Sequence, residues 1–261
     1  MRVELLPSSV AAASSQAVEG GGPQFLVSFL VNDEVVIDVG SVGLIADLDR
    51  QRKVRHVFLT HEHMDHLASL PILLENVYDP GPNCIELLAS PDVLDFVHRD
   101  IFNGRVWPDF FDLSTADDSF LKATPLVAGE PVSRAGLTIT PLPVSHCVDT
   151  LGLVVDDGST TVAFPSDTGP TAEFWQHVAA MPKLAAVFLE VSFPNSQADL
   201  ARHTGHHCPQ SFAAEVTKLP RSVRWIVVHR KARFAAEISR ELEALNLPGV
   251  EFIEPGRIYE F

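Results

Sequence analysis

The stretch Thr60-His61-Glu62-His63-Met64-Asp65-His66 decides how this chain of 261 residues is interpreted. It follows the apolar run Val54–Leu59, which predicts a strand, and it leads into 66–78, where apolar residues have helical spacing. In an extended segment, residues two apart point to the same side. His61 and His63 are therefore expected to bind one metal ion.

Two further donors follow where the chain turns out of this segment. Asp65 and His66 are expected to face a second ion beside the first. Imidazoles and a carboxylate form the donor set that zinc, iron or manganese takes in proteins. The alternative is a polar loop with chance histidines, but only 11 His occur in the chain, and three of them fall within six residues here. The segment thus favours a metal site.

Strand and helix signals alternate along the chain, which indicates one α/β domain over residues 1–261 without a linker or a repeat. The stretches 7–23 and 100–118 show no period and are expected to be loops. The expected strands are 25–31, 35–39, 54–59, 85–89, 137–143, 151–155, 160–164, 185–191, 225–228 and one that begins at 250. The expected helices are 66–78, 91–99, about 171–180, 209–218 and 232–246.

Composition excludes several classes of protein. No run of 18 apolar residues occurs, and the first thirty residues lack the basic head and apolar stretch of a secretory signal, so we expect a cytoplasmic protein without a membrane partner. Three cysteines without a CxxC pair support neither a disulfide framework nor a zinc ribbon. A net charge of −15 argues against a nucleic-acid partner, because phosphate contacts need Lys and Arg. It leaves open a small anionic substrate held by metal ions.

The pattern H-x-H-x-D-H after a strand resembles the metallo-β-lactamase superfamily. The resemblance implies an α/β fold, a four-layer αβ/βα sandwich of two mixed β-sheets flanked by helices, with two divalent metal ions at one edge. Zinc is the expected metal, with iron or manganese as alternatives. The resemblance places His61, His63 and His146 on the first ion, Asp65, His66 and His229 on the second, and Asp167 between both.

Two of these assignments have structural alternatives. His146 follows Pro143-Val144-Ser145 and could be a turn residue, and His229 could be a core or capping histidine after the strand 225–228. Asp167 lies in Ser166-Asp167-Thr168, close to the usual S/G-D-T of the superfamily.

Three further motifs resemble the class II 3′,5′-cyclic-nucleotide phosphodiesterases of this superfamily. They are F-N-G-R-V-W-P-D at 102–109, E-V-S-F-P-N at 190–195 and G-H-H-C-P at 205–209. The chain departs from the pattern in its glycine-rich opening, which is reduced to Ser8-Ser9 and Gly20-Gly21-Gly22. It also carries Cys208 in place of Thr, and His229-Arg230-Lys231-Ala232 in place of H-I-K-P.

The resemblance implies hydrolysis of cAMP or cGMP to nucleoside 5′-monophosphates, with a hydroxide that bridges the metals as nucleophile. Asp65 would orient or deprotonate the water, and His206 would contact the phosphate and protonate the leaving oxygen. Glu190 would hold His206 or a metal ligand in place, unless it only caps a loop. Asn103 and Trp107 are candidate substrate-binding residues, although the structural alternative, in which Trp107 anchors its loop, is favoured.

Other functions share the metal ligands. A tRNA 3′-processing endonuclease would need a basic RNA-clamping arm, which the sequence lacks. A lactonase, β-lactamase or thioesterase would not be expected to carry the motifs at 102–109 and 190–195. A binding module with a decayed site is disfavoured because all seven expected ligands are present. Because the superfamily often forms dimers, the resemblance also suggests a homodimer.

Overall fold

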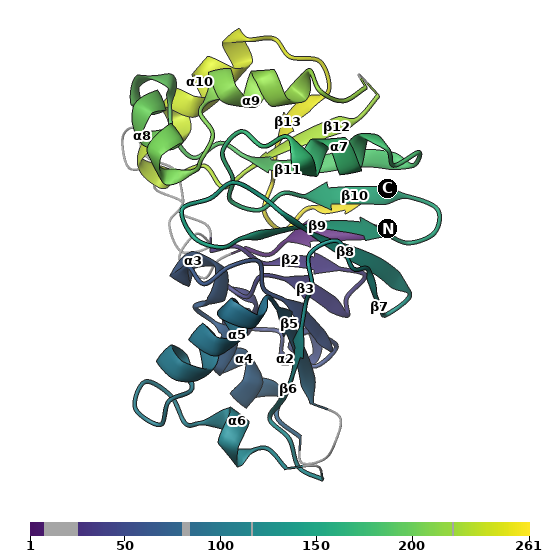
Figure 1. Cartoon of the computed structure of the whole chain (residues 1–261), viewed down its shortest axis with the longest axis vertical. Helices are drawn as coiled ribbons and strands as arrows, with labels where there is room; N and C mark the ends of the chain where they lie inside the picture. Colours follow the sequence, from purple (N-terminus) through teal and green to yellow (C-terminus); the bar gives the residue numbers. More distant parts are fainter. Residues whose placement is uncertain (8–25, 80–83, 116, 221) are drawn as a thin grey trace. The chain divides into compact units, whose positions relative to one another are not determined.

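The computed structural model describes residues 1–7, 26–79, 84–115, 117–220 and 222–261, and the contacts among them form two compact units (Figure 1). Unit 1 comprises the start of the chain, Leu26–Val127 and Pro255–Glu260, and unit 2 comprises Ala128–Glu254 with Phe261. The glycine-rich opening and most of the expected loop 7–23 lie outside the described residues. That the chain is one domain stays a prediction.

Unit 1 contains a seven-stranded mixed sheet. Its strands, in spatial order, are β14 (Ile258–Glu260), β1 (Arg2–Leu5), β2 (Phe29–Val31), β3 (Val35–Ile37), β4 (His56–Phe58), β5 (Ile85–Ala89) and β6 (Leu121–Pro125). The pairs from β14 to β3 are antiparallel, and those from β3 to β6 are parallel. All five residues of β5 are buried, as expected for a parallel strand covered on both faces.

Short helices connect the strands of unit 1. They are η1 (Val42–Leu44), α2 (Leu48–Gln51), α3 (Met64–Leu67), α4 (Leu70–Val77), α5 (Pro91–Phe96), the π-helix η2 (Val97–Ile101) and α6 (Phe110–Leu113). Leu70, Leu73 and Leu74 of α4 are fully buried and pack with the sheet in one apolar core. This core holds β4 in place, and the histidine-rich segment starts where β4 ends.

Unit 2 contains a second seven-stranded mixed sheet. Its strands are β13 (Val250–Phe252), β12 (Arg224–Val228), β11 (Leu184–Glu190), β10 (Thr161–Phe164), β9 (Leu151–Asp156), β8 (Leu137–Pro143) and β7 (Val132–Arg134). The pairs from β13 to β10 are parallel, and those from β10 to β7 are antiparallel. The helices are α7 (Glu173–Ala179), η3 (Asn195–Gln197), α8 (Ala198–Thr204), α9 (Pro209–Val216), η4 (Ala232–Phe234) and α10 (Ala235–Ala244).

The unit 2 helices cover an aromatic core. Trp175 of α7 and Phe212 of α9 pack against Trp225 of β12, with ring centroids 5.5 and 6.0 Å apart respectively. Ile238 and Leu242 of α10 complete this cluster. Each unit is thus a mixed sheet flanked by helices, and the predicted α/β class is confirmed.

Most expected elements form where the pattern placed them, but the boundaries differ in physically informative ways. The expected helix 66–78 is divided into α3 and α4, which meet at Ala68 and Ser69. Ser69 accepts a hydrogen bond from the Gly43 backbone and donates one to the carbonyl of Val39, so its side chain serves tertiary contacts. The expected loop 100–118 is partly helical, since η2 ends at Ile101 and α6 begins at Phe110.

The sequence analysis missed short elements with few apolar residues. These are β1, β6, β7, β14, α2 and α8. Strands of three to five residues at sheet edges carry too few positions for a period to show. In the part of the chain that the structure describes, none of the helices has the length and apolar character needed to cross a membrane.

Candidate metal-binding site

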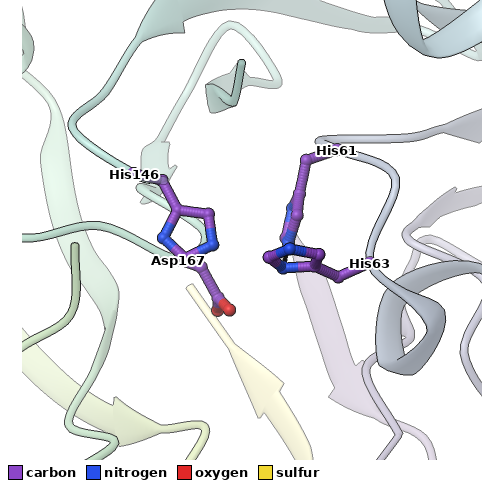
Figure 2. A group of neighbouring side chains, drawn as sticks. All are labelled: His61, His63, His146 and Asp167. Atoms are coloured by element: carbon purple, nitrogen blue, oxygen red, sulfur yellow. Dashed lines mark hydrogen bonds between the residues drawn. The ribbon is translucent and has the colours of Figure 1, made fainter. Parts of the chain in front are cut away.

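His61 and His63 come together directly after β4 (Figure 2). Nε2 of His61 and Nδ1 of His63 lie 3.1 Å apart, and the ring centroids are 4.8 Å apart. Two nitrogens bound to one tetrahedral zinc at about 2.0–2.1 Å would be separated by about 3.3 Å. The pair therefore has the spacing that a shared metal ion requires, as the H-x-H pattern predicts.

Asp38, directly after β3, holds Thr60 and His66 in place. Its buried carboxylate accepts hydrogen bonds from Thr60 N at 2.9 Å, from Thr60 Oγ1 at 3.0 Å and from His66 Nδ1 at 2.7 Å. The parallel register that pairs Ile37 with Phe58 brings the two strand ends to the same edge of the sheet.

These contacts determine which ring nitrogens carry protons. The Thr60 hydroxyl donates to Asp38, so its oxygen accepts from Nδ1 of His61 at 2.9 Å. His66 likewise donates from Nδ1 to Asp38. In both residues Nε2 is then the nitrogen with a lone pair, which is the form that binds a metal.

Asp65 sits in α3 and is held through its backbone. Its carbonyl accepts from Val27 N at 2.8 Å, and Gly40 passes so close that a Cβ there would lie 2.1 Å from this carbonyl oxygen. Only glycine fits at position 40 without displacing the loop. Gly40 therefore positions the ligand segment without offering a donor.

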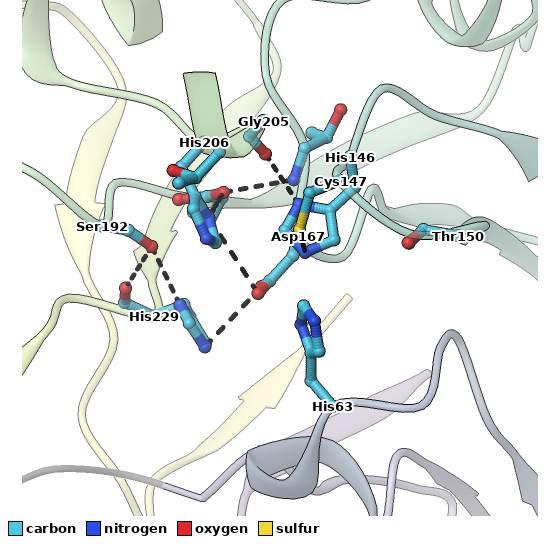
Figure 3. Close-up of polar contacts among 12 residues, drawn as sticks. His63, His146, Cys147, Thr150, Asp167, Ser192, Gly205, His206 and His229 are labelled. Carbon is cyan, nitrogen blue, oxygen red and sulfur yellow. Dashed lines mark hydrogen bonds and ion pairs between the residues drawn. The ribbon is translucent and has the colours of Figure 1, made fainter. Parts of the chain in front are cut away.

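His146 of unit 2 follows β8 and is fixed by the chain at 205 (Figure 3). Its Nδ1 donates to the carbonyl of Gly205 at 2.9 Å, and its Nε2 lies 3.6 Å from Sγ of Cys147. Burial lowers the pKa of His146 despite this hydrogen bond and the nearby charge of Asp167. The neutral imidazole that results is the form that ligates a metal.

Gly205 ends α8 in the left-handed conformation, with φ of 68°. A Cβ there would lie 2.7 Å from Cα of His146. The glycine in the motif G-H-H-C-P is thus explained by the close approach of two backbones.

Asp167 and His229 follow β10 and β12 of the same sheet. Nε2 of His229 lies 3.7 Å from Oδ1 of Asp167 (Figure 3). Ser192, which follows β11, donates to the carbonyl of His229 at 3.1 Å, so its oxygen accepts from Nδ1 of His229 at 2.9 Å. His229 is therefore oriented through Nδ1, which leaves Nε2 as its donor nitrogen.

Glu190 and His206 form a buried pair beside Asp167. Oε1 of Glu190 accepts from His206 Nδ1 at 2.5 Å and from Thr168 N at 3.1 Å, and His206 Nδ1 is 4.0 Å from Asp167 Oδ2. Burial alone would lower the pKa of His206, but the charge and hydrogen bond of Glu190 outweigh it and raise that pKa. Burial would raise the pKa of Glu190, yet His206 lowers it. The expected contact between Glu190 and His206 is confirmed, and it favours an imidazole that holds a proton.

Three residues at these strand ends adopt a backbone conformation that side chains rarely take. The φ angles are 59° at Asp38, 60° at Ser166 and 52° at His229. Such strain persists only where surrounding contacts fix it, and it concentrates at functional sites. It turns the chain sharply after β3 in unit 1 and after β10 and β12 in unit 2.

The other histidines and the candidate substrate residues have local structural contacts. His203 is exposed, whereas His207 is fully buried and bonds through Nδ1 to Ser211 Oγ at 3.0 Å. Nδ2 of Asn103 donates to carbonyls of the preceding π-helix η2, and its Oδ1 accepts from the backbone of its own loop. Trp107 packs against the unit 1 core. These contacts give Asn103 and Trp107 structural roles, and substrate binding by either stays a prediction.

Sequence reasoning missed the residues that orient the imidazoles. Thr60 and Ser192 both lie inside the quoted motifs, but hydroxyls are common in loops and carry no signal by themselves. That the seven expected ligands of the two units meet at one pair of ions also stays a prediction.

The comparison with known families agrees with this arrangement. Residues 44–229 match the family model of the beta-lactamase superfamily domain. The chain belongs to this family. The chain is thus a hydrolase of the metallo-β-lactamase superfamily. This fold generally binds divalent metal ions, and the histidine and aspartate clusters fit that chemistry.

Two relatives and one solved structure are also similar to this chain. A probable 3′,5′-cyclic-nucleotide phosphodiesterase of Yersinia pestis is 26% identical over 248 residues, which cover 81% of this chain and 70% of that protein. A 3′,5′-cyclic-nucleotide phosphodiesterase of Aliivibrio fischeri is 24% identical, with 81% and 74% covered. The crystal structure of unliganded yeast PDE1 has a TM-score of 0.77 at 17% identity and 98% coverage of both chains. This last similarity supports the metallo-β-lactamase fold.

Proposed function

We propose that this chain is a metal-dependent phosphodiesterase that hydrolyses 3′,5′-cyclic nucleotides, cAMP or cGMP, to nucleoside 5′-monophosphates. The observation that carries the proposal is the buried Glu190–His206 pair. The carboxylate of Glu190 holds the imidazole of His206, and Nδ1 of that imidazole lies 4.0 Å from Oδ2 of Asp167. Phosphodiester cleavage needs a proton donor for the leaving oxygen next to the metal ligands. The two relatives named as cyclic-nucleotide phosphodiesterases support this substrate class.

The donor set fits two divalent ions. His61, His63 and His146 would hold one ion, Asp65, His66 and His229 the other, and Asp167 would bind both. The fit rests on the 3.1 Å spacing of the His61 and His63 nitrogens and on the protein oxygens that bond Nδ1 of His61, His66, His146 and His229. When bound, such ions neutralise phosphate charge and lower the pKa of water to near neutrality.

The chain's own residues supply the remaining steps. His206 donates its proton from Nε2 to the departing 3′-oxygen, because Nδ1 is bonded to Glu190. Glu190 acts as a positioning residue that keeps the imidazole protonated and oriented. Asp65 orients the attacking water. Asn103 and Trp107 remain candidates for contact with the nucleotide.

Net charge argues against the main alternative, a tRNA 3′-processing endonuclease. At −15, the protein repels a polyanion, whereas a cyclic nucleotide carries a single phosphate charge. A lactonase or thioesterase would not need a proton donor poised for a nucleotide leaving group. A small anionic substrate, a cytoplasmic location and a homodimer remain part of the same proposal.

The test follows conversion of 3′,5′-cAMP and cGMP to 5′-AMP and 5′-GMP by chromatography, with zinc- or manganese-loaded protein. His206→Ala is expected to lower kcat by about 10²–10⁴-fold while the protein still binds two metal ions. His203→Ala, which removes an exposed histidine near the same loop, serves as the matched control and should leave kcat unchanged. Wild-type protein that holds two ions but forms no 5′-monophosphate would refute the proposed substrate. Cleavage of a tRNA precursor instead would favour the endonuclease.

A further inference from the structure

The loop after β12 places two basic side chains in different surroundings. His229 has a φ of 52°, and Lys231 is extended, with φ of −62° and ψ of 128°. The guanidinium of Arg230 lies 4.7 Å from the ring centroid of Phe252, and the ammonium of Lys231 lies 5.4 Å from that of Phe193. The turn at His229 thus leads Arg230 toward β13 and Lys231 toward the segment after β11.

Arg230 has a structural role. Its Nη1 donates to Ser239 Oγ of α10 at 2.6 Å, and burial lowers its pKa. It joins the loop to α10. Arg233, in the same loop, is exposed and lies 5.3 Å from the ring centroid of Phe234.

Lys231 has no such partner. Its side chain is half-buried, and no carboxylate among the described residues forms an ion pair with it. The carboxylates of the neighbourhood, Glu190 and Asp167, face His206 and His229 instead.

Lys231 and His206 both lie close to the ring of Phe193. The ring of Phe193, which the ammonium covers, is 5.6 Å from the ring of His206 and inclined at 62° to it. Phe193 is 7% exposed, and its buried ring is therefore a common neighbour of Lys231 and His206.

We propose that Lys231 is a substrate-binding residue, whose ammonium forms with His206 a subsite for the phosphate group of the nucleotide. The inference rests on the proposed function, since it assigns the anionic part of that substrate to named residues. An ammonium binds phosphate as a point charge, without the fixed geometry of a guanidinium. In a protein of charge −15, this local cation offsets the long-range repulsion that an approaching anion meets.

The test measures binding of two probes to metal-loaded protein by calorimetry: 5′-AMP, which carries a phosphate, and adenosine, which does not. Lys231→Met is expected to weaken 5′-AMP binding by about 10-fold or more at low ionic strength and to leave adenosine binding unchanged. The dependence of 5′-AMP affinity on salt should also become shallower. Lys231→Arg should restore most of the affinity.

Arg233→Met is the matched control, because it removes one positive charge from the same loop at an exposed site. It should change 5′-AMP affinity by less than twofold. If Lys231→Met and Arg233→Met weaken 5′-AMP binding equally, only the net charge of the protein matters, and the proposal is overturned. So would loss of adenosine binding together with 5′-AMP binding, which would indicate a structural role.

The two proposals fail in different ways. If the wild-type protein hydrolyses cyclic nucleotides but Lys231→Met changes neither KM nor 5′-AMP affinity, the subsite is wrong and the function stands. If no cyclic nucleotide is hydrolysed but Lys231→Met still selectively weakens 5′-AMP binding, the subsite stands and the reaction is wrong.

Discussion

The carboxylate of Asp38 offers a direct test of how the ligand segment is held. In Asp38→Asn, the remaining oxygen can still accept from Thr60 N and Oγ1, but the new amide N–H₂ replaces the oxygen that faces Nδ1 of His66 at 2.7 Å. Two donors then face each other. His66 must either lose this hydrogen bond or move its proton to Nε2, where it blocks the nitrogen that binds metal.

The structure sets the size of this effect. One hydrogen bond to a charged group is lost out of three, at a cost of about 1.5–3 kcal/mol. That cost corresponds to roughly 10–100-fold in affinity for the ion held by His66, the range usual for residues that orient metal ligands. The backbone should be unaffected, because asparagine tolerates the φ of 59° at this position.

Zinc affinity would be measured by competition with a chromophoric chelator, with the free energy of unfolding determined in parallel. Asp33→Asn is the matched control, since Asp33 also has a positive φ, 66°, but lies on an exposed turn where it pairs with Arg2. If Asp38→Asn binds both zinc ions as tightly as wild type and Asp33→Asn, Asp38 does not orient His66 for metal binding.

Two further predictions concern stability. Gly205→Ala should lower the free energy of unfolding by more than about 1–2 kcal/mol, the cost of an alanine at φ of 68°, because its Cβ would also meet His146 Cα at 2.7 Å. Gly129→Ala is the control, since Gly129 has φ of 83° with open space around it. It should lose only the conformational part. Equal losses in denaturant titrations would show that the backbone contact is unimportant. Burial lowers the pKa of His207 to about 4. Between about pH 6.5 and 4 the unfolded chain binds a proton that the folded chain does not, so the free energy of unfolding should fall by up to about 3 kcal/mol as pH falls, and His207→Asn should remove this slope.

The sequence predicted the structure best where an apolar run with strand character leads into a metal-ligand motif. The apolar run 54–59 ends in a histidine-rich segment, and the structure places β4 and the His61–His63 pair there. The buried parallel strands β5 and β11 are mostly apolar, with Glu86 and Glu190 as their charged residues, and their limits were predicted to within one residue.

Other features depend on contacts between residues far apart in the sequence, which a local sequence pattern cannot predict. The break between α3 and α4 follows from Ser69, which bonds to Val39 and Gly43 across the fold. The glycine at 40 is needed because the carbonyl of Asp65, 25 residues later, and the backbone of Val27 lie against it. The role of Ser192 likewise depends on a strand order that brings residue 229 beside it.

The structure shows one rule for orienting the imidazoles, applied separately in each unit. In five of them a protein oxygen accepts from Nδ1: Thr60 for His61, Asp38 for His66, Gly205 for His146, Glu190 for His206 and Ser192 for His229. Each acceptor belongs to the same unit as its histidine. Folding of a unit therefore fixes both the rotamer and the tautomer before any ion arrives, and metal binding need not meet that ordering cost. His63 differs, since its Nδ1 faces Nε2 of His61. Its orientation is thus expected to depend on the metal more than that of the other five.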